Sequence, residues 1–327
     1  MKMKIAVIGT GAYSLAMTIM LSKNEKNNII LWSESENKVK EFNDTGSLKS
    51  ILDVDLPSKI SISTSYEEVI KDAEVIFVMV AAGFLDSVNK EIKNYYQSNM
   101  HIVIASKGIE QDTCLFPHEI ISKYIKTDNL AVISGPSFAI DLAHEEPVGL
   151  AIASKNPATL KIIQQVLSTS TLKLRETDDL LGIEICGSVK NVIAIAAGII
   201  SGLGYSESSQ VFLINEALHD MKYLIDDLGG NPRTIMSFAG VGDLLLTCTS
   251  KKSRNFSFGY VIGSTKSKEK IEEYLSSNTV EGYYTLLSIQ KLVTERNVNI
   301  PIVNLIYDIV INNDDPKLLI DLLINKK

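Results

Sequence analysis

Hydrophobic positions in the first half of the chain fall into short, β-branched runs separated by helix-like segments. The runs lie at residues 4–8 (KIAVI), 29–32, 75–80 (VIFVMV), 102–105 and 130–133, and two further strands are expected at 148–153 and 171–175. Helical composition marks the segments at residues 12–21, 66–71, 83–95, 117–125 and 158–167. Strands that alternate with helices predict an α/β fold with a doubly wound, mostly parallel sheet.

The pattern changes after Asp178. The remaining residues show helical periodicity without a clear strand, and the expected helices lie at residues 209–228, 282–296, 302–312 and 317–324. We therefore predict two domains. The first is a Rossmann-type α/β domain, residues 1–178, and the second is an all-α domain, residues 179–327.

A long apolar stretch at the start of the second domain carries a lysine. Lys190 and Asn191 directly precede the apolar segment 192–200. A helix that is hydrophobic all round is normally buried, and burying an unpaired lysine is costly. Burial and nearby cations lower a lysine pKa, which lets the amine carry protons near neutral pH. The alternative is an amine that reaches solvent from a helix end.

The chain begins with a strand, a glycine turn at residues 9–11 (GTG) and a helix. Gly9 permits a tight turn, and Gly11 lets the backbone approach a pyrophosphate at the helix N-terminus. Ser14 replaces the third glycine of the usual dinucleotide fingerprint, so we expect a looser contact between helix and strand. A signal peptide would share the early lysines, but the glycine turn and the second strand favour a βαβ unit.

One carboxylate bears on the choice of dinucleotide. Glu34 follows the second strand, about where such folds place an acidic residue for the ribose hydroxyls. A carboxylate there repels a 2′-phosphate, which predicts NAD or NADP as cofactor with NAD favoured. The alternative is a solvated loop charge among Glu36, Asn37 and Lys38.

Composition restricts the function further. The 327 residues are 45% hydrophobic and 22% charged with a net charge of -7, which is typical of a globular protein and disfavours binding to nucleic acid or anionic membranes. Cys114, Cys186 and Cys248 are far apart, and the histidines show no ligand spacing. We therefore expect no metal and no disulfide framework, in a reducing cytoplasm. We also expect no segment long and apolar enough to span a bilayer.

Glycine-rich and polar motifs follow one another in a recognisable order. They are GTG at 9–11, SKGI at 106–109, SGPSFA at 134–139, CGSVKN at 186–191, AGVGDL at 239–244, SRN at 253–255 and VEG at 280–282. Together they resemble the bacterial biosynthetic NAD(P)-dependent sn-glycerol-3-phosphate dehydrogenases, over nearly the whole chain. The resemblance implies reversible reduction of dihydroxyacetone phosphate to sn-glycerol 3-phosphate for glycerophospholipid synthesis. It also implies a Rossmann domain, a helical substrate domain and a homodimer.

The resemblance also implies roles for individual residues. The proton carrier is Lys190, assisted by Lys107 and Asp243. The residues expected around the substrate are Lys107, Gly135, Ser137, Lys190, Asn191, Asp243, Ser253, Arg254 and Asn255. At the cofactor, the βαβ pattern predicts Gly9, Gly11 and Glu34. The other residues expected there are Ala12, Tyr13, Lys107, Ala139, Arg254, Thr279 and Glu281.

The reaction requires side chains of these types. A base must take the hydroxyl proton as hydride leaves C2. Lys107 would depress the pKa of Lys190 and polarise the ketone in the reverse direction. Asp243 can orient an ammonium, and Arg254 offers a planar fork to a phosphate. Taken singly, Asp243 could be a helix cap and Arg254 part of a solvated basic run.

Two departures from the family affect loops, and the second keeps a catalytically silent rival open. Ala81-Ala82 stand where the family usually has Pro-Ser, and residues 206–210 (SESSQ) replace a usual Gly-Asp-Asn. One rival is a related dehydrogenase acting on a 3-hydroxy acid or on ketopantoate, although the SRN motif favours a phosphate over a carboxylate. The other rival is a catalytically silent dinucleotide-binding sensor.

Overall fold

The computed structural model describes residues 2–265 and 267–326. The chain forms two compact units. The first comprises the residues up to Ser106 together with Pro117–Leu180, and the second comprises Lys107–Phe116 and the residues from Leu181 onward. The sequence placed a domain boundary between residues 178 and 179 and did not anticipate that residues 107–116 join the second unit. The domain division itself stays a prediction.

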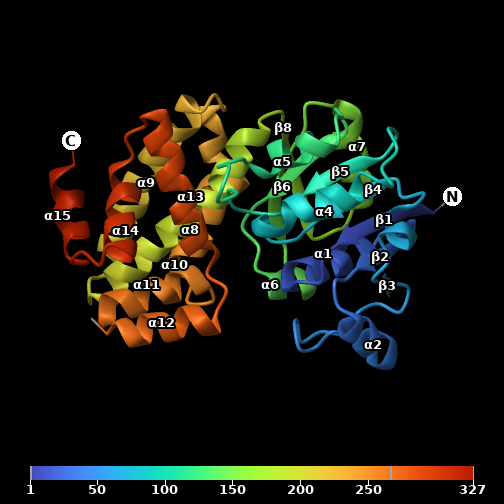
Figure 1. Ribbon diagram of the computed structural model, residues 1–327, viewed down its shortest axis with the longest axis horizontal. Coiled ribbons are helices and arrows are strands. Elements are labelled where there is room, and N and C mark those ends of the chain that lie inside the picture. Colours follow the sequence, from blue (N-terminus) through green and yellow to red (C-terminus); the bar gives the residue numbers. More distant parts are fainter. Residues whose placement is uncertain (1, 266, 327) are drawn as a thin grey trace. The chain divides into compact units, whose positions relative to one another are not determined.

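The first unit is built on one sheet of eight strands in the order β3-β2-β1-β4-β5-β6-β7-β8 (Figure 1). The strands are β1 (Met3–Ile8), β2 (Asn27–Trp32), β3 (Ser61–Ser63), β4 (Val75–Val78), β5 (His101–Ile104), β6 (Leu130–Ser134), β7 (Val148–Ala153) and β8 (Leu172–Thr177). Every neighbouring pair is parallel except β6 and β7. The doubly wound, mostly parallel sheet is therefore confirmed. Its strand order reverses between β1 and β4, where such sheets bind ligands beyond the strand carboxyl ends.

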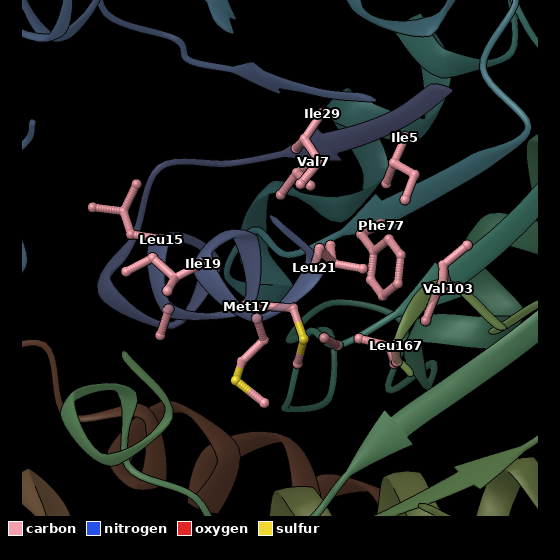
Figure 2. Packing of buried hydrophobic residues seen from close by; sticks show 14 of the residues in the cluster. Ile5, Val7, Leu15, Met17, Ile19, Leu21, Ile29, Phe77, Val103 and Leu167 are labelled. Carbon is pink, nitrogen blue, oxygen red and sulfur yellow. The ribbon is translucent and has the colours of Figure 1, made fainter. Parts of the chain in front are cut away.

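Helices pack against this sheet and close a continuous apolar core. They are α1 (Ala12–Ser22), α2 (Glu36–Thr45), α3 (Tyr66–Ile70), the 3₁₀ turn η1 (Ala82–Phe84), α4 (Leu85–Ile92), α5 (Pro117–Tyr124), α6 (Ala139–Ala143) and α7 (Pro157–Val166). Figure 2 shows Phe77 of β4 beside Leu21 of α1, and Val7, Ile29 and Met17 belong to the same apolar cluster. Burying side chains of this size contributes about 1.5–3 kcal/mol each, which holds the first turn of α1 at the end of β1.

Two elements near the edge of the sheet were not predicted. In β3 only the central Ile62 is buried, so its three residues show no apolar run. Helix α2 buries only Phe42. The side chain of Ser35 caps the start of α2, and Gly46 ends it with a left-handed φ of 71°. Local capping signals of this kind define α2 better than its hydrophobic pattern does.

The second unit is helical, and none of its described residues lies in a strand. Its elements are α8 (Leu180–Gly202), α9 (Glu207–Asp227), η2 (Pro232–Met236), η3 (Phe238–Gly242), α10 (Asp243–Thr249), α11 (Arg254–Ser264), α12 (Lys268–Ser277), α13 (Glu281–Arg296), α14 (Pro301–Ile311) and α15 (Leu318–Asn325). The all-α character expected for this part is confirmed.

Helix α8 corrects one expectation from the sequence. Its 23 residues are long and apolar enough to cross a membrane by length and composition, whereas we expected no such segment. Its most apolar window is entirely buried within the protein. A core helix of a folded domain has this composition for the same reason as a spanning helix, because no face of it meets water.

Helices α8 and α11 approach each other through glycines. A Cβ added at Gly198 would lie 2.0 Å from a backbone oxygen of α11, and one added at Gly259 would lie 1.9 Å from a backbone oxygen of α8. Gly202 and Gly263 show the same close approach. The two backbones are therefore in direct contact, which holds α11 along the C-terminal part of α8.

Candidate active site

Lys190 lies in the middle of the buried helix α8, and its side chain is almost inaccessible to solvent. Its Nζ donates to Asp243 Oδ1 at 2.5 Å and to Thr247 Oγ1 at 3.0 Å. The amine therefore does not extend to solvent. Both acceptors lie on α10, one turn of helix apart.

Asp243 receives a lysine on each carboxylate oxygen. Oδ1 accepts from Lys190, and Oδ2 accepts from Lys107 Nζ at 3.0 Å. Burial acts to raise the pKa of Asp243, but the positive charges of Lys107 and Lys190 outweigh it and hold the pKa below its ordinary value. The group is therefore an ionised carboxylate shared between two ammonium groups.

The backbone before Asp243 explains its position. The residues of η3 form a single π-type turn, and Gly240 within it has non-helical angles of φ -83° and ψ -106°. A Cβ at Gly240 would lie 2.1 Å from the backbone oxygen of Ile235, so only glycine fits. The Ser237 hydroxyl accepts from the Gly240 N–H and begins the turn. Irregular turns of this kind often occur at functional sites.

The environment of Lys190 makes its amine titratable near neutral pH. Burial lowers the pKa of Lys190 to about 8, the carboxylate of Asp243 opposes the shift, and the positive charge of Lys107 adds to it. At pH 7 the amine is mostly protonated, and about one unit higher it is half deprotonated. This is the range in which a lysine can both give and take a proton.

Thr247 is a member of this cluster that the sequence did not single out. Its hydroxyl donates to the Asp243 backbone oxygen at 2.6 Å and accepts from Lys190. The signal available in the sequence was its spacing of four residues from Asp243, which places both on one face of a helix. With Asp243, Thr247 fixes the direction of the Lys190 amine.

Lys107 reaches Asp243 from the loop at residues 107–116, which is anchored to α8 and α13. The Gly108 N–H donates to Ser188 Oγ at 3.0 Å, and the Ser288 hydroxyl donates to the Ile109 oxygen at 3.0 Å. Gly108 has a left-handed φ of 116°, which glycine adopts at low cost. These contacts hold the loop in the second unit and deliver the Lys107 ammonium to the cluster.

Asn191 and Asn255 connect the beginnings of α11 and α13 to α8. Asn255 Nδ2 donates to Asn191 Oδ1 at 3.0 Å, and the Gly282 N–H donates to Asn255 Oδ1 at 2.8 Å. Asn191 Nδ2 donates to Glu281 Oε2 at 3.3 Å. Both asparagine side chains are buried, and their amides orient one another. These bonds bring three of the predicted motifs, at 186–191, 253–255 and 280–282, into one network.

The start of α11 presents a cation to solvent. The Ser253 hydroxyl caps the helix by accepting from the Phe256 N–H. Arg254 is exposed and forms no salt bridge with any residue in the described ranges. Thr279 is also exposed, just before α13. The guanidinium of Arg254 is therefore available to an anion.

The glycine turn of the first unit has the features of a pyrophosphate site. Gly9 has a left-handed φ of 121°, and a Cβ there would lie 3.1 Å from the Met79 oxygen. Nothing lies within 4 Å of a Cβ added at Gly11, which precedes α1 without a side-chain cap. The first N–H groups of α1, including that of Ala12, begin beside this open space. A dinucleotide phosphate fits such a helix start.

Ser14 does not loosen the packing of α1. Its side chain is buried, and its hydroxyl donates to the Met79 oxygen at 3.2 Å, just beyond β4. A hydrogen bond between α1 and the end of β4 thus replaces the close contact that a glycine would make. This corrects the expectation from the sequence.

Other predicted residues of the first unit gather beyond β6. Tyr13 Oη and Ser137 Oγ lie 3.1 Å apart, and Ala139 begins α6. A Cβ at Gly135 would lie 2.7 Å from the Gly149 oxygen, so this position requires glycine for packing against β7. Backbone packing therefore explains the glycine at position 135 without a ligand.

Glu34 is paired. Its Oε1 lies 2.6 Å from Lys38 Nζ, one turn further along the chain. Partial burial acts to raise the pKa of Glu34, but the hydrogen bond and charge of Lys38 outweigh it and lower the pKa. The same Nζ lies 3.4 Å from Thr10 Oγ1 in the glycine turn. Glu34 is thus held in an ion pair beside the glycine turn, and its role at the ribose stays a prediction.

Comparison with known proteins decides the family. The description "NAD-dependent glycerol-3-phosphate dehydrogenase N-terminus" matches residues 4–160, and the corresponding C-terminus matches residues 179–321. The chain belongs to the NAD-dependent glycerol-3-phosphate dehydrogenase family. Glycerol-3-phosphate dehydrogenase (NAD(P)+) of Leptospira biflexa is 34% identical over 96% of this chain and 95% of its own length. That of a Thermoanaerobacter species is 33% identical over 96% and 94%.

Solved structures agree with membership in the glycerol-3-phosphate dehydrogenase family. The crystal structure of glycerol-3-phosphate dehydrogenase from Coxiella burnetii has a TM-score of 0.92 at 27% identity, and covers 99% of both chains. A ketopantoate reductase from Ralstonia eutropha is more distant, with a TM-score of 0.59 at 14% identity, and shares the fold alone. Among the described residues no group of histidine, cysteine, aspartate or glutamate side chains could hold a metal ion.

Proposed function

We propose that this member of the glycerol-3-phosphate dehydrogenase family catalyses the reversible reduction of dihydroxyacetone phosphate to sn-glycerol 3-phosphate with NAD(P)H. The observation that supports this most strongly is the buried cluster in which Asp243 joins Lys190 and Lys107. A carboxylate between two lysines provides a proton carrier beside a second cation, which reduction of a ketone requires.

Lys190 is the proposed proton carrier in both directions. In reduction its ammonium gives a proton to the C2 oxygen, and in oxidation its neutral amine takes the hydroxyl proton. The dinucleotide, when bound, supplies or accepts the hydride at C2. Asp243 and Thr247 aim the Lys190 amine. Lys107 stabilises negative charge that develops on the C2 oxygen.

The proposed phosphate site lies at the start of α11. Arg254 offers a planar guanidinium that can bind two phosphate oxygens at once. Ser253 and Asn255 flank it, and the N-terminus of α11 also favours an anion. Asn191 holds Asn255 in place. Gly135 and Ser137 of the first unit remain proposed substrate contacts.

The cofactor contacts also remain proposals. Gly9, Gly11, Ala12 and Tyr13 would hold the pyrophosphate at the start of α1. The others proposed from the resemblance are Lys107, Ala139, Arg254, Thr279 and Glu281. We propose NADH as the favoured dinucleotide, because the Glu34 carboxylate opposes a 2′-phosphate.

We further propose that the enzyme works in the cytoplasm as a homodimer and supplies glycerophospholipid synthesis. Cys114, Cys186 and Cys248 are buried and form no disulfide within the part of the chain that the structure describes, as suits a reducing compartment. Light scattering coupled to size exclusion tests the dimer, and a particle of 36.0 kDa would contradict it.

The decisive experiment for the activity is a substrate comparison. Oxidation of NADH and of NADPH is followed at about 340 nm with dihydroxyacetone phosphate, unphosphorylated dihydroxyacetone and ketopantoate. We expect turnover to require the phosphorylated ketone, because Arg254 reads the phosphate. Preferred turnover of ketopantoate would contradict the proposal. Dinucleotide binding without turnover of any substrate would indicate a sensor instead.

A further inference from the structure

Lys38 occupies an unusual place beside the glycine turn. It lies on the first turns of α2, and its side chain returns to the end of β1, where Nζ is 3.4 Å from Thr10 Oγ1. The Thr10 hydroxyl lies 3.3 Å from that of Ser33, the residue directly after β2. The Lys38 ammonium is thus held over the carboxyl ends of the two strands that flank the dinucleotide turn.

This location is where a dinucleotide-binding sheet distinguishes its two cofactors. In such folds an acidic residue after the second strand binds the ribose 2′-hydroxyl, and a nearby cation accommodates a 2′-phosphate. Here both kinds of group are present within one ion pair, Glu34 and Lys38 at 2.6 Å. The choice of cofactor therefore depends on which anion the ammonium faces.

The exposure of the Glu34–Lys38 ion pair allows another anion to replace Glu34 as the partner of Lys38. Glu34 is more exposed than its partner, with 56% of its side-chain surface accessible against 30% for Lys38. An exposed pair between residues four apart is weak. A 2′-phosphate carries up to two negative charges and three acceptor oxygens, so it competes effectively with one carboxylate for the ammonium. Glu34 can then turn to solvent.

We propose that Lys38 is the acceptor of the 2′-phosphate of NADPH, and that Glu34 is the internal anion that competes for it. This inference rests on the proposed function and extends it. With a 2′-hydroxyl, Glu34 stays paired to Lys38 and accepts from the ribose. With a 2′-phosphate, Lys38 changes partner. The enzyme therefore accepts both dinucleotides, and the Glu34–Lys38 pair determines the ratio of their affinities.

The test measures binding apart from catalysis. Dissociation constants for NADH and NADPH are measured by fluorescence, and those for 5′-AMP and 2′,5′-ADP by calorimetry, since each pair differs only by the 2′-phosphate. Lys38→Met should raise the dissociation constants of NADPH and 2′,5′-ADP by about 10-fold or more, the size expected for losing one charge-assisted hydrogen bond. The same substitution should change the dissociation constants of NADH and 5′-AMP by less than about 3-fold.

Two further variants complete the design. Glu34→Gln should lower the dissociation constant of NADPH several-fold relative to that of NADH. The substitution releases Lys38 and removes a negative charge that repels the 2′-phosphate. Lys40→Met is the matched control, since Lys40 lies on α2 and is exposed. It should leave the ratio of the two affinities unchanged.

Equal effects of Lys38→Met on both dinucleotides, or no effect on either, would overturn the inference and leave the proposed function intact. A Lys40→Met effect as large as that of Lys38→Met would also overturn it, because general charge would then explain the result. Failure of the wild-type protein to bind either dinucleotide would overturn both proposals.

Discussion

Replacing Lys107 by Met should move the pH dependence of catalysis toward higher pH. The ammonium of Lys107 lies 3.0 Å from Asp243 Oδ2, across the carboxylate from Lys190. Its positive charge contributes to the depressed pKa of Lys190, which burial lowers to about 8. Met keeps an unbranched apolar stem and removes only the charge.

The size of the shift follows from the geometry of a shared carboxylate. One hydrogen bond at each oxygen holds the two nitrogens roughly 6 Å apart. Two unit charges at that distance repel by about 3 kcal/mol at an effective dielectric constant of about 20, which corresponds to about 2 pK units. Side-chain relaxation reduces this, so we expect the pKa of Lys190 to rise by about one unit.

The assay is kcat/KM against pH in both directions, which reports the free enzyme. Oxidation of glycerol 3-phosphate needs the neutral amine, so its kcat/KM should rise with pH to a midpoint at about 8. Reduction of dihydroxyacetone phosphate needs the ammonium, so its kcat/KM should fall through the same midpoint. The substrate phosphate titrates near pH 6, below this window.

In Lys107→Met both midpoints should move upward together, while Lys251→Met, which alters an exposed lysine of the second unit, should leave them in place. An unchanged or lowered midpoint in Lys107→Met would refute the electrostatic reasoning. So would the absence of any titration between about pH 7 and 9.5 in the wild-type enzyme.

Three further substitutions have distinct expected outcomes. Arg254→Lys keeps the charge but loses the planar fork, so KM for dihydroxyacetone phosphate should rise by about 10-fold or more, and an equal loss with unphosphorylated dihydroxyacetone would show that Arg254 does not read the phosphate. Thr247→Val removes one acceptor from the proton carrier, so kcat should fall by about 10-fold with little change in KM; an unchanged kcat would remove Thr247 from the cluster. Gly259→Ala places a Cβ 1.9 Å from the backbone oxygen of Ile195 and should cost about 3 kcal/mol of unfolding free energy, measured by denaturant, whereas an equally stable variant would contradict the close packing of α8 and α11.

Much of the fold could be predicted because its signals are local. Strands β1, β4, β5 and β6 read as apolar runs, and the glycine turn marks the first strand–helix junction. The three residues of β3 bury only Ile62 and extend the edge through pairing with β2. Their structure comes from a neighbour distant in sequence, which no hydrophobic pattern records.

The candidate site was predictable in its residues more than in its connections. An isolated lysine in an apolar helix indicated Lys190, and the motif order indicated Asp243. The sequence did not show that Lys107 and Lys190 share Asp243, or that Lys38 pairs with Glu34. Contacts of this kind depend on side-chain directions across elements, which spacing along the chain does not specify.

The central claim is that Lys190 carries the proton, and kcat of Lys190→Met tests it most directly. General acid–base catalysis contributes about 10²–10⁴-fold, so kcat should fall by at least that factor in both directions. Asp243 keeps Lys107 as a partner, so melting temperature and NADH affinity should persist. Lys222→Met, which alters an exposed lysine on α9, is the matched control. A folded, NADH-binding Lys190→Met enzyme that retains most of its kcat would contradict the account.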